Sequence, residues 1–361
     1  MSKYVQLAKR ENNNKRGFLI VNPYLGKHVA TKPSQIFAMF DEMATLKPED
    51  LIPERTLVIG FAETATALGV RYAVKNNTFF IQTTRENVAS ETGYIYFSEE
   101  HSHATAQYIC KEYVDDIVDK IDRIIFIDDE ITTGNTVLNA IKAINAAYDK
   151  SFKYEVVSVL NSMNESQLAD YAEKNIGVYC IDKIDNSDYE DVAKALSDDG
   201  TYRVVDVNTE YDGHIYGARC EIDDTRTMTS GAEYQADCDV IADNIMEQFL
   251  INENEKILVL GTEEFMYVGL NFAFELEQMG MNVKFHATTR SPISVSRDED
   301  YPLHERYQLR SVYDKDRTTF IYDLQNYDRV FIVTEQAYLL DKIGLNSLVK
   351  ALGQIVSIIA I

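Results

Sequence analysis

The sequence predicts an α/β protein built from two doubly wound, mostly parallel sheets. Short apolar runs of strand length alternate with segments that carry apolar residues at helical spacing, which is the pattern of βαβ units. Two of these runs end at a glycine that leads into a helix-like segment, at Gly60 and at Gly261. Because the order of strand, glycine and helix recurs in the second half, a second sheet of the same kind is expected.

Composition narrows the function classes. The chain has 361 residues, of which 45% are hydrophobic and 26% charged, so two or three domains with real cores are expected. A net charge of −23 disfavours a nucleic-acid partner, because phosphate backbones are bound by basic patches. No apolar run reaches membrane-spanning length, and the N-terminus is not that of a signal peptide. The four cysteines form no Cys-x-x-Cys pair, which indicates free thiols and a cytoplasmic protein.

The first elements lead to a glycine loop. A strand is expected at 18–21 and a helix at 34–46, and a second strand at 56–59 ends at Gly60. The loop 61–66 then leads into a segment with apolar residues at helical spacing. This signal is weak alone, since strand–glycine–helix turns are common in α/β proteins, but it lies about one βαβαβ unit before the motif at 124–136.

A strand at 79–83 is followed by Arg85, whose guanidinium suits bidentate contacts with phosphate oxygens. Beyond it lies a polar stretch with Glu100, His101 and His103. The alternate histidines could form a metal pair, donate a proton or contact a base, and a solvated loop with incidental histidines is the plainer interpretation. A zinc site remains open, although the pattern is not His-Glu-x-x-His.

The most informative segment is 124–136. Four apolar residues form an expected buried strand, and Asp128 and Asp129 follow directly. A hydroxyl-rich glycine turn then leads into a helix, so that free backbone N–H groups and the helix dipole can hold a phosphate. The two acids cannot bind phosphate themselves and suit hydroxyl groups or magnesium. The predicted phosphate cradle consists of Thr132, Thr133, Gly134, Asn135 and Thr136.

Further strands are expected at 154–160 and 178–181, followed by an acidic run at 182–200 that reads as a solvated helix and loop. The second half then repeats three landmarks in order. A strand at 257–260 ends at Gly261, and a strand at 283–287 leads into Thr288-Thr289-Arg290, like Thr83-Thr84-Arg85.

The third landmark is Asp328-Arg329, which corresponds to Asp122-Arg123 at nearly the same spacing from the preceding Thr-Thr-Arg. Duplication of one unit explains this order, and chance similarity of two α/β domains is the alternative. Residues 333–338 contain neither an acid pair nor Thr-Gly, so a second copy would have lost the phosphate cradle.

The segment 124–136 resembles the phosphoribosyl pyrophosphate (PRPP) loop of type I phosphoribosyltransferases, in which an acid pair precedes Thr-Gly and a hydroxyl residue. Gly-Phe-Ala-Glu-Thr-Ala, Glu-Glu-His-Ser-His-Ala and Thr-Arg-Ser-Pro resemble the subfamily encoded in tellurite-resistance-associated operons, which has a C-terminal TRSP domain. The resemblance covers most of the chain apart from roughly residues 182–212. It implies a phosphoribosyltransferase domain at 1–205 and a TRSP domain at 206–361, either a degenerate copy or Rossmann-like.

The resemblance also implies roles. Asp128 and Asp129 would hold the ribose hydroxyls directly or through Mg²⁺, and Glu130 would support them or act as a base. Arg85 would bind pyrophosphate, and Arg290 and Ser291 would reach an anionic group if the second unit replaces the partner of a family dimer. The implied pyrophosphate loop is Gly60, Phe61, Ala62, Glu63 and Thr64. A flexible lid would carry the candidates Glu100, His101 and His103.

The expected function is transfer of phosphoribosyl from PRPP to a base-like acceptor with release of pyrophosphate, or the reverse, in biosynthesis of a nucleoside-like metabolite. A homodimer fits the family. One alternative is a PRPP-binding regulator without catalysis, although such a protein is expected to lose the lid arginine or to carry a basic face. The other is a metal-dependent hydrolase built on His101 and His103.

Overall fold

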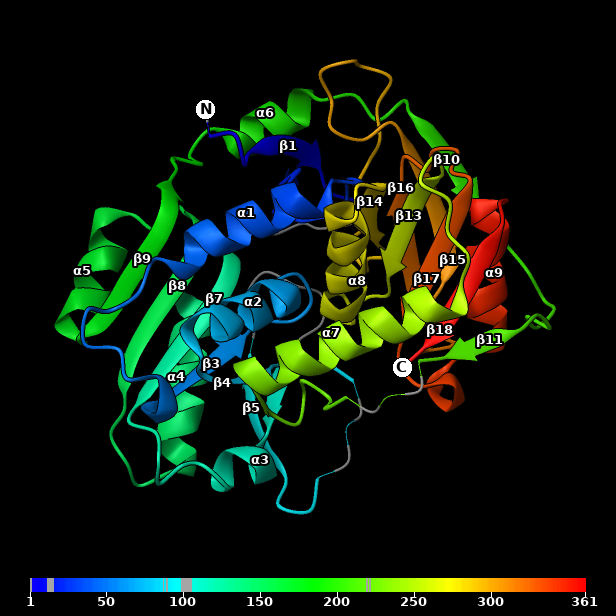
Figure 1. The fold of residues 1–361 in the computed structure, drawn as a ribbon. Coiled ribbons are helices and arrows are strands. Elements are labelled where there is room, and N and C mark those ends of the chain that lie inside the picture. The colour runs from blue at the N-terminus through cyan, green and yellow to red at the C-terminus, as the bar shows by residue number, and fades with distance from the viewer. Residues whose placement is uncertain are drawn as a thin grey trace. The chain divides into compact units, whose positions relative to one another are not determined.

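The computed structural model describes residues 2–11, 16–86, 88, 90–98, 106–218, 220 and 222–361. The chain forms two compact units (Figure 1). The acid-pair unit consists of residues 37–185 and 222–236, and the second unit consists of residues 1–36, 186–221 and 237–361. Both units are therefore assembled from separate stretches of sequence, and the division at 205/206 stays a prediction. No helix in the described part of the chain is long and apolar enough to cross a membrane.

A six-stranded sheet forms the acid-pair unit, in the order β12-β4-β3-β7-β8-β9. All neighbouring strands are parallel except β12 and β4. The central strands are buried on both faces, which explains their continuous apolar sequences. The strands are β3 (Thr56–Gly60), β4 (Phe79–Gln82), β7 (Arg123–Ile131), β8 (Lys153–Asn161), β9 (Ile176–Lys183) and β12 (Thr229–Ser230). The helices are α1 (Pro33–Ala44), which the unit shares with the second unit, α2 (Thr66–Asn76), α3 (Lys111–Asp115), α4 (Asn135–Ala147) and α5 (Glu165–Glu173).

A separate antiparallel hairpin, β5 (Tyr94–Ser98) and β6 (Ala106–Cys110), branches from the sheet after β4. Thr84 joins the hairpin to the sheet, because its N–H and carbonyl both bond the backbone of Tyr108, at 3.0 and 3.1 Å. Ile95, Phe97 and Ile109 bury the inner face of the hairpin in the same core cluster as α4. The predicted lid overlaps this hairpin in sequence, and its candidates Glu100, His101 and His103 lie outside the described residues.

The edge strand β12 comes from far along the chain. Its residues Thr229 and Ser230 pair antiparallel with Phe80 and Phe79 of β4. The N–H of Gln82 donates to the carbonyl of Thr225 at 2.8 Å, and the Thr225 hydroxyl donates to the Gln82 side-chain oxygen at 2.7 Å. The segment 222–230 therefore extends the sheet beside the carboxyl end of β4.

The second unit holds a five-stranded, all-parallel sheet in the order β11-β18-β17-β13-β14. A three-stranded sheet, β10-β15-β16, and the hairpin β1–β2 complete its strands. The strands are β1 (Gln6–Lys9), β2 (Phe18–Val21), β10 (Thr201–Val204), β11 (Ile215–Gly217), β13 (Lys256–Gly261), β14 (Asn282–Ala287), β15 (Glu305–Arg310), β16 (Thr318–Tyr322), β17 (Arg329–Thr334) and β18 (Val356–Ala360). The helices are α6 (Tyr189–Ala195), α7 (Gly231–Gln248), which the unit shares with the acid-pair unit, α8 (Tyr267–Gln278) and α9 (Lys342–Leu352).

The predicted class, α/β with two mostly parallel sheets, is confirmed. One expected helix is more buried than its acidic sequence indicates. Residues 182–200 contain α6, whose Tyr189 packs edge-on against Phe18 of β2 at 5.5 Å between ring centroids. Asp191 and Lys194 of α6 are exposed, but Tyr189 and Ala193 are buried, and Glu190 accepts a hydrogen bond from the N–H of Gly17 at 3.0 Å.

Candidate active site

The acid pair lies at the carboxyl end of β7. The structure extends this strand two residues beyond the acid pair, because β7 continues to pair with β8 as far as Ile131 opposite Asn161. Asp128, Asp129 and Glu130 are all partly buried. The N–H of Asp129 donates to Oδ1 of Asp128 at 2.9 Å, which fixes the first carboxylate beside the backbone of the second.

A tyrosine from α5 fixes the conformation of the turn after β7. Gly134 has φ = +77°, a conformation that glycine adopts without penalty. The hydroxyl of Tyr171, from α5, donates to the Gly134 carbonyl at 2.6 Å, and a Cβ added at Gly134 would lie 2.4 Å from that hydroxyl. Helix α4 begins at the next residue, Asn135, whose N–H donates to the Thr133 hydroxyl at 3.3 Å. The first N–H groups of a helix have no partner within it, so the turn can bind an anion.

The loop after β3 is held against both neighbouring strands. The N–H of Phe61 donates to the carbonyl of Ile127 in β7 at 3.1 Å. The N–H of Ala62 donates to the Thr83 hydroxyl at 2.9 Å, and the Gln107 amide donates to the Ala62 carbonyl at 3.1 Å. Gly60 leaves no room for a side chain, since a Cβ there would lie 3.0 Å from the Ala65 carbonyl.

Three adjacent strands bring most of the predicted residues to one edge. Gly60 in β3 lies opposite Gln82 in β4 and opposite Ile127 in β7. The loop 61–64, the half-buried Arg85 and the acid pair therefore follow the carboxyl ends of neighbouring parallel strands, where α/β sheets bind their ligands. The hairpin reaches the same region, because the Asn139 amide of α4 donates to the carbonyl of Ser98 at 3.1 Å.

Two contributors were missed by the sequence analysis. Tyr171 and Gln107 support the two loops from elements that are distant in sequence, and neither belongs to a motif. A buried tyrosine and a buried glutamine need hydrogen-bond partners, but those partners could not be identified from the sequence. In the described residues no three histidine, cysteine or acidic side chains cluster as metal ligands.

The second-domain candidates lie at the carboxyl end of β14. Nε of Arg290 donates to Glu263 at 2.9 Å, and its Nη2 lies 3.4 Å from Glu264. The N–H of Ser291 donates to the Thr289 hydroxyl at 3.2 Å, and its carbonyl accepts from the Tyr322 hydroxyl at 2.7 Å.

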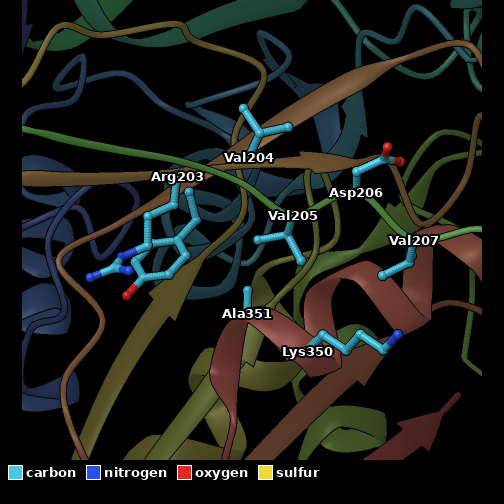
Figure 2. A pocket seen from close by; sticks show the side chains of 8 residues that line it. Arg203, Val204, Val205, Asp206, Val207, Lys350 and Ala351 are labelled. Carbon is cyan, nitrogen blue, oxygen red and sulfur yellow. The ribbon is translucent and has the colours of Figure 1, made fainter.

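A pocket elsewhere on the second unit contains none of the predicted residues. Figure 2 shows it beside β10 and α9, with Arg203, Asp206 and Lys350 among its lining residues. Arg203 forms an ion pair with Glu305 of β15, so its charge is already balanced. The pocket is an open groove at a sheet edge and offers no arrangement of catalytic groups.

Comparison with known proteins agrees with this geometry. Residues 4–183 match the family described as "Phosphoribosyl transferase", and residues 226–352 match "TRSP domain C terminus to PRTase_2". The chain therefore belongs to the phosphoribosyltransferases that carry a C-terminal TRSP domain. The second match begins inside the segment 222–236, which packs in the acid-pair unit. No curated protein matches the chain.

Part of the chain is similar to solved structures. Adenine phosphoribosyltransferase from Rhodothermus marinus is 16% identical, with a TM-score of 0.36, over 50% of this chain and 94% of that protein. The Trypanosoma brucei enzyme, solved with AMP, pyrophosphate and ribose-5-phosphate, is 19% identical over 46% of this chain and 68% of its own, with a TM-score of 0.31. Orotate phosphoribosyltransferase from Aeropyrum pernix is 15% identical over 46% and 80%, with a TM-score of 0.30.

Proposed function

We propose that the acid-pair unit transfers 5-phosphoribosyl from PRPP to a base-like acceptor and releases pyrophosphate, or runs the reverse reaction. The observation that carries this proposal is the grouping of an acid pair, a glycine turn at a helix N-terminus and a second glycine loop at one sheet edge. These groups match the three parts of PRPP: a diol, a 5′-phosphate and a pyrophosphate. The family supports the same reaction class.

In the forward reaction the bond from the ribose anomeric carbon to the pyrophosphate oxygen breaks, and a bond from that carbon to the acceptor forms. The electron pair of the broken bond leaves with pyrophosphate. Catalysis consists mainly of positioning and of charge stabilisation around a ring that becomes cationic. Asp128 and Asp129 hold the ribose hydroxyls beside that ring, and Glu130 supports them or takes the acceptor proton.

The donor set fits magnesium. Asp128 and Asp129 are consecutive, partly buried acids, and Mg²⁺ prefers carboxylate oxygens together with substrate phosphates. A bound Mg²⁺ would offset the negative charge of the pyrophosphate. In a chain of net charge −23, such local neutralisation is needed for an anionic substrate to bind.

Both phosphate groups are assigned to backbone donors. The turn Thr132–Thr136 takes the 5′-phosphate through its N–H groups and the hydroxyls of Thr132, Thr133 and Thr136. The loop Gly60–Thr64 takes pyrophosphate, with Arg85 as the cationic partner. The acceptor side is assigned to the hairpin turn with Glu100, His101 and His103. A cytoplasmic homodimer and a role in tellurite or stress resistance remain part of the proposal through the family resemblance.

Pyrophosphate release from PRPP and Mg²⁺, measured over a panel of purine, pyrimidine and related bases, tests the reaction. Wild type should release pyrophosphate with at least one base, and Asp128→Asn should lower kcat/KM by about 30-fold or more, equivalent to about 2 kcal/mol. Asp170→Asn, on the exposed face of α5, should leave the rate unchanged. Tight PRPP binding without release over the panel would favour a regulator, and metal bound without PRPP affinity would favour the hydrolase.

A further inference from the structure

The second unit contains a buried charged cluster that the proposed reaction does not use. Its centre is Glu263, whose side chain is only 1% exposed. The carboxylate accepts hydrogen bonds from Arg290 Nε at 2.9 Å and from Arg317 Nη1 at 2.8 Å. The Ser311 hydroxyl donates a third bond, to the other carboxylate oxygen. A buried carboxylate thus lies between two guanidiniums and a hydroxyl. Each guanidinium also faces a second acid, since Arg290 Nη2 lies 3.4 Å from Glu264 and Arg317 Nη2 lies 3.3 Å from Asp314.

This cluster occupies the place of the pyrophosphate loop in the acid-pair unit. The two sheets share the strand order β4-β3-β7-β8 and β14-β13-β17-β18. The registers of the two sheets agree as well. Two residues before the glycine that ends the strand, Val58 pairs with Phe80 in one sheet and Val259 pairs with Phe285 in the other. Gly261, the equivalent of Gly60, lies opposite Val333 of β17.

The loops themselves make equivalent hydrogen bonds. The N–H of Thr83 donates to the Gly60 carbonyl at 2.9 Å, and that of Thr288 donates to the Gly261 carbonyl at 3.2 Å. In both units the next threonine pairs antiparallel with the second strand of the hairpin that follows. Duplication of one unit explains these coincidences better than chance similarity of two sheets.

One hydrogen bond that both units share shows which residues of the two loops are equivalent. The Thr83 hydroxyl accepts from the N–H of Ala62 at 2.9 Å, and the Thr288 hydroxyl accepts from the N–H of Glu263 at 3.0 Å. Glu263 therefore holds the position of Ala62. It has φ = +52°, which is uncommon for a residue with a side chain. Its carboxylate extends from the very loop that, in the acid-pair unit, is proposed to receive pyrophosphate.

We propose that the second unit retains a pyrophosphate-type anion site and that the Glu263 carboxylate replaces the ligand there. The inference rests on the proposed function, which assigns pyrophosphate to the loop 60–64. Paired guanidiniums with a hydroxyl donor are the usual partners of phosphate oxygens. The Arg290 and Arg317 side chains are 15% and 19% exposed, so an anion from solvent could reach them once the carboxylate is removed.

Two consequences follow for the whole chain. The second unit binds no pyrophosphate in the native protein, because the carboxylates of Glu263, Glu264 and Asp314 already balance the charge of its two guanidiniums. Removing the Glu263 carboxylate takes from Arg290 Nε and Arg317 Nη1 the acceptor that they share, and a pyrophosphate can supply oxygens to both nitrogens while Glu264 and Asp314 keep their contacts with the same arginines.

The test is a calorimetric titration of sodium pyrophosphate, in EDTA to exclude Mg²⁺, into wild type and Glu263→Ala. The variant should bind one more pyrophosphate per chain than wild type. The double variant Glu263→Ala/Arg317→Ala should lose at least tenfold in affinity for this extra pyrophosphate. Glu255→Ala is the matched control, since it also removes a mostly buried carboxylate from an arginine, Arg329, but at the other end of β13.

Folding of Glu263→Ala is followed in parallel by thermal unfolding. If this variant is unfolded in buffer alone, millimolar pyrophosphate should restore its folding, and should not do so for the double variant. A folded Glu263→Ala without extra binding, extra binding that persists without Arg317, or an unfolded variant that pyrophosphate does not rescue would each overturn the inference. Failure of the proposed function would appear separately, as absence of PRPP binding to wild type with Mg²⁺.

Discussion

At the scale of single residues, the candidate site depends on two supports that have no chemical role of their own. The Tyr171 hydroxyl donates a hydrogen bond to the carbonyl of Gly134, and the Gln107 amide donates one to the carbonyl of Ala62. Each bond fixes the conformation of a loop at the carboxyl end of the sheet. Preorganised donors of this kind stabilise charge without reorganisation during the reaction.

Gly134→Ala should disrupt the turn. Positive φ costs about 1–2 kcal/mol for a residue with a side chain, and overlap with the Tyr171 hydroxyl adds about 1–3 kcal/mol. Denaturant unfolding should show this loss, and PRPP affinity should fall with it. Gly280→Ala is the control, because Gly280 also has positive φ but has open space around it. Equal losses in the two variants would mean that contact with Tyr171 does not matter.

His286 predicts a pH dependence of stability. Burial lowers the pKa of His286 to about 4, below its ordinary value of 6.5. Its Nδ1 accepts from the N–H of Ala287 at 2.9 Å, which requires the neutral ring. The unfolded chain therefore binds a proton that the folded chain rejects, so stability from this residue is complete above pH 6.5 and is lost as the pH falls towards 4.

The size of this effect is about 1.4 kcal/mol per pH unit within that window. It is measured as the free energy of unfolding of wild type minus that of His286→Gln, because carboxylates titrate in both proteins. The difference should shrink as the pH falls from 6.5 to 4. A pH-independent difference for His286→Gln would contradict the assignment.

At the scale of elements, motifs contained in one stretch were predictable and contacts between distant stretches were not. The strand, acid pair, glycine turn and helix of 124–136 follow from local pattern, because each residue type there has a local reason. Strand β12 and Thr225 could not be predicted, since two residues of edge strand have no periodicity. The partner of β12 is β4, about 150 residues earlier in the chain.

Thr225→Val should loosen that edge. It removes the hydroxyl that donates to the buried Gln82 side chain, and an unsatisfied buried acceptor costs about 1–3 kcal/mol. Hydrogen exchange should become faster in β4, next to the loop after β3. Thr45→Val removes an exposed hydroxyl bond to Glu42 and should cost less than about 0.5 kcal/mol. If exchange in β4 were unchanged, the segment 222–230 would not support the sheet.

At the scale of the whole molecule, the sequence indicated two related units, and the equal registers and loop bonds support that origin. What sequence alone could not reveal is that each unit is assembled from separate stretches, because packing of residues 1–36 and 222–236 is decided by contacts far along the chain. The equivalent edges of the two sheets differ at the acid pair. Asp128 and Asp129 of the acid-pair unit correspond by register to Thr334 and Glu335 of the second unit.

The central claim is that the acid pair binds the ribose of PRPP. Calorimetric titration of PRPP with Mg²⁺ into wild type and Asp128→Asn/Asp129→Asn tests it most directly, with circular dichroism to verify folding. We expect wild type to bind one PRPP per chain and the variant to bind at least about 100-fold more weakly, through loss of both charged acceptors. Equal affinities in two folded proteins, or no binding by wild type, would contradict the account.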